Sequence, residues 1–181
     1  MSSLPYLSFD HSGESQRRVS DCFKKYAGAQ FAELPLVDLL EREAAKFLSH
    51  ARYRQFKEVH LDRIHQDAYI HASLPLLSGF AGYVASLRQE LKEVRLARRQ
   101  ATDQAALEKI ALPFKPGNPL EEEIRVLQLQ WDKLDELSAM HYADFSALLA
   151  YKLKLMLMVR LWSFDEQKGY EIFVESTNAL S

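Results

Sequence analysis

Apolar residues in the C-terminal third of the chain recur at helical spacing. Between Asn118 and His141 they fall three or four positions apart, which places them on one face of a helix. The positions on this face are Leu120, Ile124, Leu127, Trp131, Leu134 and His141, with Leu137 beside them. Asn118 is a suitable N-cap, Pro119 suits the first helical position, and Glu121–Glu123 place negative charge where a helix start favours it. We therefore predict a helix that begins at Pro119.

A second helix is predicted directly after the sequence HYAD, because Asp144 can cap a helix that starts at Phe145. Fourteen of the eighteen residues from Phe145 to Trp162 are apolar. A helix that is apolar on most sides is covered by neighbours on several faces. We predict that residues 119–162 form a helical hairpin at the centre of the protein, with Trp131, Tyr151 and Trp162 in the core.

The N-terminal part also has helical spacing. Pro5 favours an extended start over residues 1–12. A helix is predicted from Glu14 to Ala27, and another is opened by Pro35. The predicted inward positions of these two helices are Val19, Cys22, Phe23, Tyr26, Leu36, Leu40, Ala44, Phe47 and Leu48.

Helical spacing continues less regularly through residues 53–69. Pro75, Gly79 and Gly82 then predict a kink or a helix boundary. A long helix is expected from Tyr83 to Ala111.

These elements predict an all-α fold of about six or seven helices. We divide the chain into an N-terminal helical region (1–111), a connection rich in proline and glycine (112–118) and a C-terminal part (119–181). The C-terminal part holds the hairpin and a final helix, whose capping box is Ser163 and Glu166. We expect the two helical parts to form one compact domain.

Composition narrows the class of protein. The 181 residues are 48% hydrophobic and 27% charged, an ordinary globular balance, and the net charge of −2 gives no basic field for nucleic acid. Cys22 is the only cysteine and lies on an apolar stripe, so we interpret it as structural. Lys152 and Lys154 disfavour a membrane span over 145–162. The N-terminus has no signal-peptide pattern, so we expect a cytoplasmic protein.

Candidate chemistry is sparse. His60, His65 and His71 cluster with Asp62 and Asp67, but a di-iron bundle needs Glu-x-x-His motifs that do not occur in the sequence. We interpret this region as a solvated helix face, with a metal site as the alternative. The sequence also lacks GxxxxGK[ST], GxGxxG and GxSxG. We therefore expect no catalytic residue, no cofactor and no metal ligand.

His141 lies beside Tyr142 and Asp144 at the predicted reversal. A role in proton transfer is conceivable for this imidazole. We favour a position at the end of the first hairpin helix, where a cation interacts well with the helix dipole.

One surface feature suggests binding. Arg88, Lys92, Arg95 and Arg99 are spaced by four, three and four residues, which forms a basic stripe on the long helix. Repulsion between like charges at this spacing calls for acidic groups opposite them. Those groups belong either to the first hairpin helix, at Glu121–Glu123, Asp132, Asp135 and Glu136, or to a partner protein.

Several motifs occur together in the order of a known family. They are SLPYLSFD at the start, then NPLEEE, WDKLDEL, HYAD, LLAYKLKL and FDEQKG. The best-matching ranges are 1–12 and 118–175. In this respect the chain resembles a family of small bacterial proteins that are encoded with V/A-type ATPase (ATP synthase) subunits.

The resemblance implies a non-catalytic structural component of the C/d-like type, which links the central stalk of the ATPase to its membrane proteolipid ring. Its partners would be the other ATPase subunits, and it would be peripheral on the inner membrane. We expect contacts through Arg88, Lys92, Arg95 and Arg99, and through Tyr6 and Phe9. The alternative is a free-standing helical enzyme or a ligand- or metal-binding protein that uses the His60–His71 region.

Overall fold

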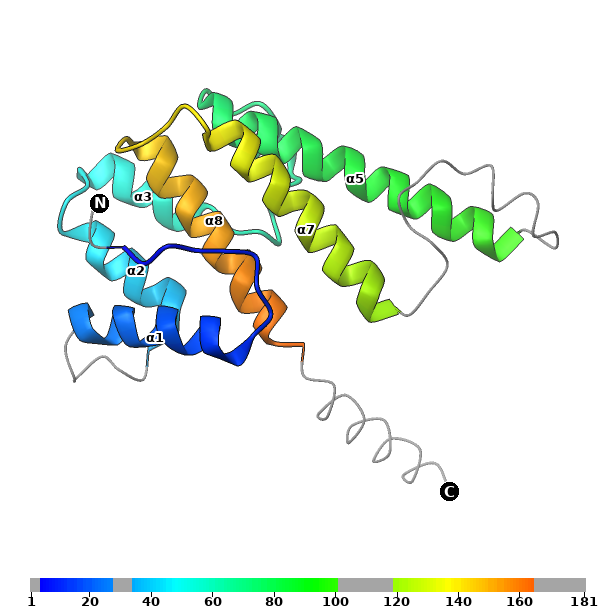
Figure 1. Cartoon of the computed structure of the whole chain (residues 1–181). Helices are drawn as coiled ribbons and strands as arrows, with labels where there is room; N and C mark the ends of the chain where they lie inside the picture. Colours follow the sequence, from blue (N-terminus) through cyan, green and yellow to red (C-terminus); the bar gives the residue numbers. More distant parts are fainter. Residues whose placement is uncertain (1–3, 28–33, 101–118, 165–181) are drawn as a thin grey trace, which may run out of the picture.

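The computed structural model describes residues 4–27, 34–100 and 119–164, and these ranges are all-helical apart from turns and one extended segment (Figure 1). The described ranges contain α1 (Gly13–Ala27), α2 (Leu36–Ala45), α3 (His50–Glu58), α4 (Asp67–Ile70), α5 (Pro75–Gln100), α7 (Pro119–Ser138) and α8 (Phe145–Trp162). The predicted all-α bundle is confirmed. None of these helices is long and apolar enough to cross a membrane. The predicted connection 112–118 and the final helix lie outside the described residues.

The helix α8 is the centre of the bundle. Asp144 caps it, as predicted, since its Oδ1 atom accepts a hydrogen bond of 2.8 Å from the Ala147 N–H. The helix packs against α2, α5 and α7. Its buried apolar residues are Leu149, Ala150, Leu153, Leu155, Leu157, Met158 and Leu161. Burial on several sides explains why its sequence is apolar nearly all round.

An extended segment, residues 4–12, crosses α8 and is called the N-terminal strap here (Figure 1). The Tyr151 hydroxyl donates a hydrogen bond of 2.9 Å to the Pro5 carbonyl, and Trp162 Nε1 donates one of 3.0 Å to the Asp10 carbonyl. Phe9 packs edge-on against Trp131, with ring centroids 5.7 Å apart. Trp131 is buried as predicted, and Tyr151 and Trp162 are partly buried against the core. These aromatic residues tie the start of the chain to the hairpin.

The prediction that Phe47 faces inward is wrong. The helix α2 ends at Ala45, and a turn follows in which the Phe47 N–H donates to the Ala44 carbonyl. The turn breaks the helical phase before Phe47, whose side chain is 85% exposed. Tyr26, predicted on the inner face of α1, is also exposed, at 57%.

Residues 49–71 do not continue as one helix. Ser49 caps α3 by accepting a hydrogen bond from the Arg52 N–H, and turns over residues 59–66 separate α3 from the single turn of α4. Phe56 and Ile64 are nonetheless fully buried. The apolar positions in this part of the sequence therefore belong to two short helices and the turn between them, which explains why their helical spacing is irregular.

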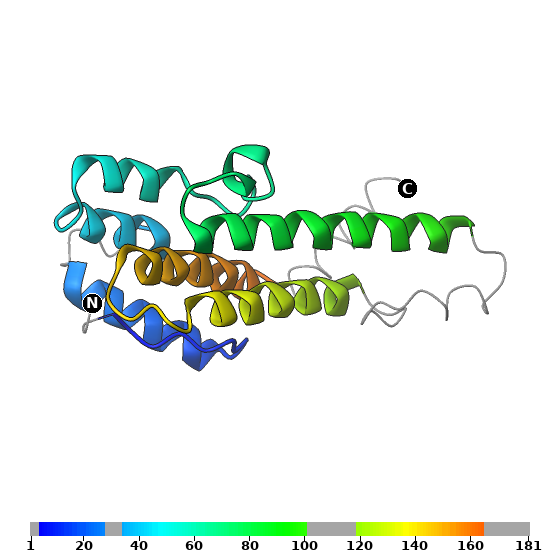
Figure 2. The same ribbon diagram turned by 90° about the horizontal axis from the view of Figure 1, so that it is seen from above.

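The helix α5 begins at Pro75, so the predicted helix boundary is confirmed at this proline, but the helix runs through Gly79 and Gly82 and the predicted start at Tyr83 is wrong. Proline fits the first helical position because its missing N–H would have no partner there. Gly79 allows a close approach to α7, since a Cβ atom at this position would lie 3.3 Å from Leu137 Cδ2. The two helices run side by side and project beyond α1–α4 (Figure 2).

Candidate partner-binding groove

The basic stripe of α5 lies beside a groove formed with α7 and α8. The groove has a volume of about 320 Å³. Its apolar floor consists of Leu61, Val84, Leu87, Leu91, Val126, Leu127 and Leu157. Its polar groups are Arg88, Arg95, Glu123, Gln130 and Arg160. Residues far apart in the chain therefore meet here, and we call this the arginine groove.

Arg88 is held by His65, which comes from the turn before α4. Arg88 Nη1 lies 3.1 Å from His65 Nε2. A guanidinium only donates, so this contact requires a lone pair on Nε2 and places the imidazole proton on Nδ1. Within the described ranges that buried Nδ1 has no hydrogen-bond partner. The contact orients Arg88 without neutralising its charge.

Arg95 and Arg160 share one carboxylate. Glu123 Oε1 lies 3.9 Å from Arg95 Nη2, and Glu123 Oε2 lies 3.2 Å from Arg160 Nη2. Both arginine side chains are about half exposed. Three guanidinium groups and one carboxylate leave a formal charge of +2 on the arginine groove. The groove is therefore suited to an additional carboxylate, which arginine binds with two parallel hydrogen bonds.

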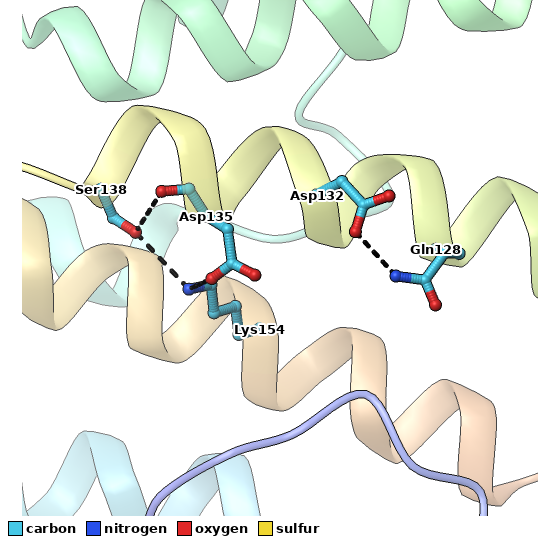
Figure 3. A network of polar contacts seen from close by, with 5 residues as sticks. All are labelled: Gln128, Asp132, Asp135, Ser138 and Lys154. Carbon is cyan, nitrogen blue, oxygen red and sulfur yellow. Dashed lines mark hydrogen bonds and ion pairs between the residues drawn. The ribbon is translucent and has the colours of Figure 1, made fainter.

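Asp132 and Asp135 of α7 bind residues outside the stripe (Figure 3), and so does Glu136. Lys154 of α8 pairs with Asp135 and lies 3.5 Å from Ser138 Oγ. Asp132 accepts a hydrogen bond of 2.7 Å from Gln128, and Glu136 pairs with Lys133. Glu123, one of the carboxylates expected to face the stripe, forms an ion pair with Arg95. The internal alternative is thus confirmed at Glu123.

The structure places the remaining stripe residues as follows. Lys92 is exposed on α5, and the Arg99 side chain lies outside the described part. Arg160 was missed by the sequence analysis. The sequence did indicate an exposed position for Arg160, since it is the only charged residue after Lys154 in an otherwise apolar helix.

The two predicted aromatic contacts lie away from the arginine groove. Tyr6 is 82% exposed on the N-terminal strap. Phe9 is occupied within the protein by its contact with Trp131. Phe9 therefore contributes to folding, and of the two only Tyr6 presents a free surface.

The histidines do not assemble into a metal constellation in the described ranges, where no three His, Cys, Asp or Glu side chains come together. The helix α7 ends at Ser138, so His141 lies in the turn and not at the helix end. Its Nδ1 atom is 2.5 Å from Asp144 Oδ2. The pKa of Asp144 is lowered, first by the Ala147 N–H and then by the hydrogen bond with His141.

Comparison with known families gives one match. Residues 107–181 match a family described as a protein of unknown function (DUF2764). The matched segment is less than half of the chain and includes α7 and α8, hence Glu123 and Arg160 of the arginine groove. No curated protein and no solved structure matches the chain.

Proposed function

We propose that this protein is a non-catalytic structural subunit that docks to a partner through the arginine groove, and that the partner is another subunit of a V/A-type rotary ATPase. The observation that carries the docking proposal is the excess of guanidinium groups over carboxylates in this groove. The ATPase assignment is supported by the ordered motifs of the sequence. On this proposal the protein is cytoplasmic and peripheral on the inner membrane, between the central stalk and the proteolipid ring.

The chemistry of the groove supports protein recognition. An apolar floor flanked by half-exposed arginines can bury aliphatic side chains while the guanidinium groups bind carboxylates on the same partner helix. Arginine is favoured at such interfaces because its planar fork is rigid and weakly hydrated. The partner surface we propose is acidic, with aliphatic residues between the acidic ones.

The bundle is also suited to transmit force. The strap, α2, α5 and α7 all contact α8, and most of the buried apolar residues, from Leu7 to Leu161, form one cluster, while Leu87 and Leu91 form a second, smaller one. Close-packed interiors deform little under load. A protein that links a rotating stalk to a membrane ring needs this property and needs no catalytic group.

The first test is purification of the tagged protein from its own membranes in mild detergent. We expect the catalytic and central-stalk ATPase subunits to co-purify at matching stoichiometry. Recovery of the protein alone, with a bound metal or small molecule, would overturn the proposal in favour of the free-standing alternative.

A further inference from the structure

Arg88 and Arg95 lie seven residues apart on α5, and both line the arginine groove. Seven residues are two helical turns, or about 10.5 Å along the helix axis. Leu91 is buried between them on the same face of α5 and also lines the groove. The groove thus presents two positive positions at a fixed separation, with an apolar position between them.

The apolar floor of the groove favours a helix as the partner segment. Leu87 and Leu91 form a small buried cluster, against which Val126 of α7 packs. These three residues also line the groove. An amphipathic helix lays its apolar face into such a groove and presents residues seven positions apart on that same face. A helix lying along α5 therefore matches the separation of Arg88 and Arg95.

The two arginines differ in how they are engaged within the protein. Arg88 keeps its full charge, since His65 Nε2 accepts its hydrogen bond of 3.1 Å through a lone pair. Arg95 Nη2 lies 3.9 Å from Glu123 Oε1, which is an ion-pair distance but is too long for a hydrogen bond. A partner carboxylate that forms two parallel hydrogen bonds with Arg95 would be held more strongly than Glu123 is.

Glu123 competes with the partner for Arg95. Its other carboxylate oxygen lies 3.2 Å from Arg160 Nη2, so Glu123 retains a positive neighbour when it gives up Arg95. The side chains of Glu123, Arg95 and Arg160 are between 37% and 55% exposed. Ion pairs between such exposed groups contribute little to stability, so the partner carboxylate can replace this one.

We infer that the arginine groove recognises a partner helix with two carboxylates seven residues apart, one bound at Arg88 and the other at Arg95 in place of Glu123. Aliphatic side chains between the two carboxylates pack on Leu91. Glu123 is then an internal competitor that weakens docking at one of the two positions. This inference rests on the proposed docking function, and it specifies the partner segment that this function requires.

The test measures the binding of two dye-labelled synthetic peptides to the purified full-length protein by fluorescence anisotropy. Both are alanine-rich helical peptides of identical composition, with two leucines placed three and four residues after the first glutamate. The second glutamate follows the first by seven residues in one peptide and by five in the other, which turns it to a different face of the helix. We expect the seven-residue spacing to bind at least tenfold more tightly, since only that peptide reaches both arginines.

Glu123→Gln should tighten binding of the seven-residue peptide by about fivefold and leave the five-residue peptide unchanged, because only the former displaces Glu123. Glu121→Gln is the control of equal charge change. Glu121 is exposed on α7 and lies outside the groove lining, so this variant should leave both affinities unchanged. Arg95→Gln should abolish the preference between the peptides. All three variants change exposed or half-exposed side chains and should keep the wild-type melting temperature.

Other results would overturn the inference. Equal affinity of wild type for the two peptides, or no binding of either, would exclude recognition of the seven-residue spacing. Weaker or unchanged binding of the seven-residue peptide to Glu123→Gln would mean that Glu123 orients the arginines and does not compete. Binding of wild type, but not of Arg95→Gln, to phosphatidylglycerol vesicles would assign the groove to lipid headgroups instead. Failure of the proposed function is seen separately, as purification of the tagged protein without ATPase subunits, since the peptide assay contains none of them.

Discussion

Lys152 Nζ lies 2.8 Å from Glu41 Oε1 in the interior of the bundle, where α8 meets α2. Lys152 is fully buried and also donates a hydrogen bond of 2.6 Å to the Phe56 carbonyl at the end of α3. This one lysine side chain joins three helices.

Breaking the pair on one side should be strongly destabilising. Lys152→Met leaves the Glu41 carboxylate buried without a counter-charge, which typically costs about 3–5 kcal/mol of unfolding free energy. Lys152→Met/Glu41→Leu should recover much of that loss, because it leaves no buried charge. Chemical denaturation of both single variants and the double variant measures the coupling. Additive losses would contradict a direct Lys152–Glu41 interaction.

The same pair predicts a pH dependence. Burial lowers the pKa of Lys152 below its ordinary value of 10.5, and Glu41 opposes this shift. Between the folded pKa and 10.5 the unfolded chain binds more protons, so the free energy of unfolding should rise with pH in that window. Lys152→Met should lack this rise. If the unfolding free energy of the variant and of the wild type rose equally with pH, the lowered pKa of Lys152 would be contradicted.

Asp144 should stabilise the start of α8 through its cap. Asp144→Ala is expected to lose about 0.5–2 kcal/mol near neutral pH. Folding lowers the pKa of the Asp144 carboxyl below its ordinary value of 3.8. The stability that wild type gains over Asp144→Asn from the charged cap should therefore be fully present above pH 3.8. It should be lost as pH falls through the folded pKa. Thermal denaturation across acidic pH measures this. A constant difference between wild type and Asp144→Asn would be inconsistent with a charged cap.

Gly79 and Gly82 of α5 provide a matched pair. Gly82 has open space around the position of a Cβ atom, so Gly82→Ala should stabilise the protein by about 0.5–1 kcal/mol through helix propensity. Gly79→Leu should destabilise it by about 1–3 kcal/mol, because the new side chain meets Leu137 of α7. Gly82→Leu is the size control and should not show this loss. Equal effects of the two leucine substitutions would argue against the close approach.

Trp131 tests the contact between the hairpin and the N-terminal strap. Trp131→Ala removes a buried indole that packs against Phe9 and whose ring centroid lies 5.4 Å from Lys154 Nζ. The variant should lose about 3–5 kcal/mol of unfolding free energy. Phe9→Ala should cost less, since Phe9 is only partly buried. Denaturant unfolding of both variants gives the comparison. A loss near zero for Trp131→Ala would mean that the indole is not part of the core.

The hairpin could be predicted closely because its signals are local. Asp144 as a cap, Pro119 at a first helical position and an apolar α8 each act within a few residues. The exposure of Phe47 and the course of α5 through Gly79 and Gly82 could not be predicted in this way. Helical spacing does not show that α2 ends at Ala45, and the close approach of α5 to Leu137 at Gly79 is a tertiary contact.

The candidate site was only partly accessible from the sequence. Spacing on one helix identified Arg88 and Arg95, but the meeting of these residues with Arg160 and Glu123 requires the packing of α5, α7 and α8. His65 was noted as a metal candidate, and its contact with Arg88 gives it a positioning role that spacing does not reveal.

The most direct measurement compares co-purification of ATPase subunits with wild type, Arg88→Glu/Arg95→Glu and a control of equal charge change, Arg17→Glu/Arg54→Glu. The control residues are exposed on α1 and α3, away from the arginine groove. The account predicts that wild type and control retain the ATPase subunits at equal stoichiometry. It predicts at least a tenfold loss, about 1.4 kcal/mol or more, for the groove variant at an unchanged melting temperature. Equal recovery with the groove variant and the control would contradict docking through the arginine groove.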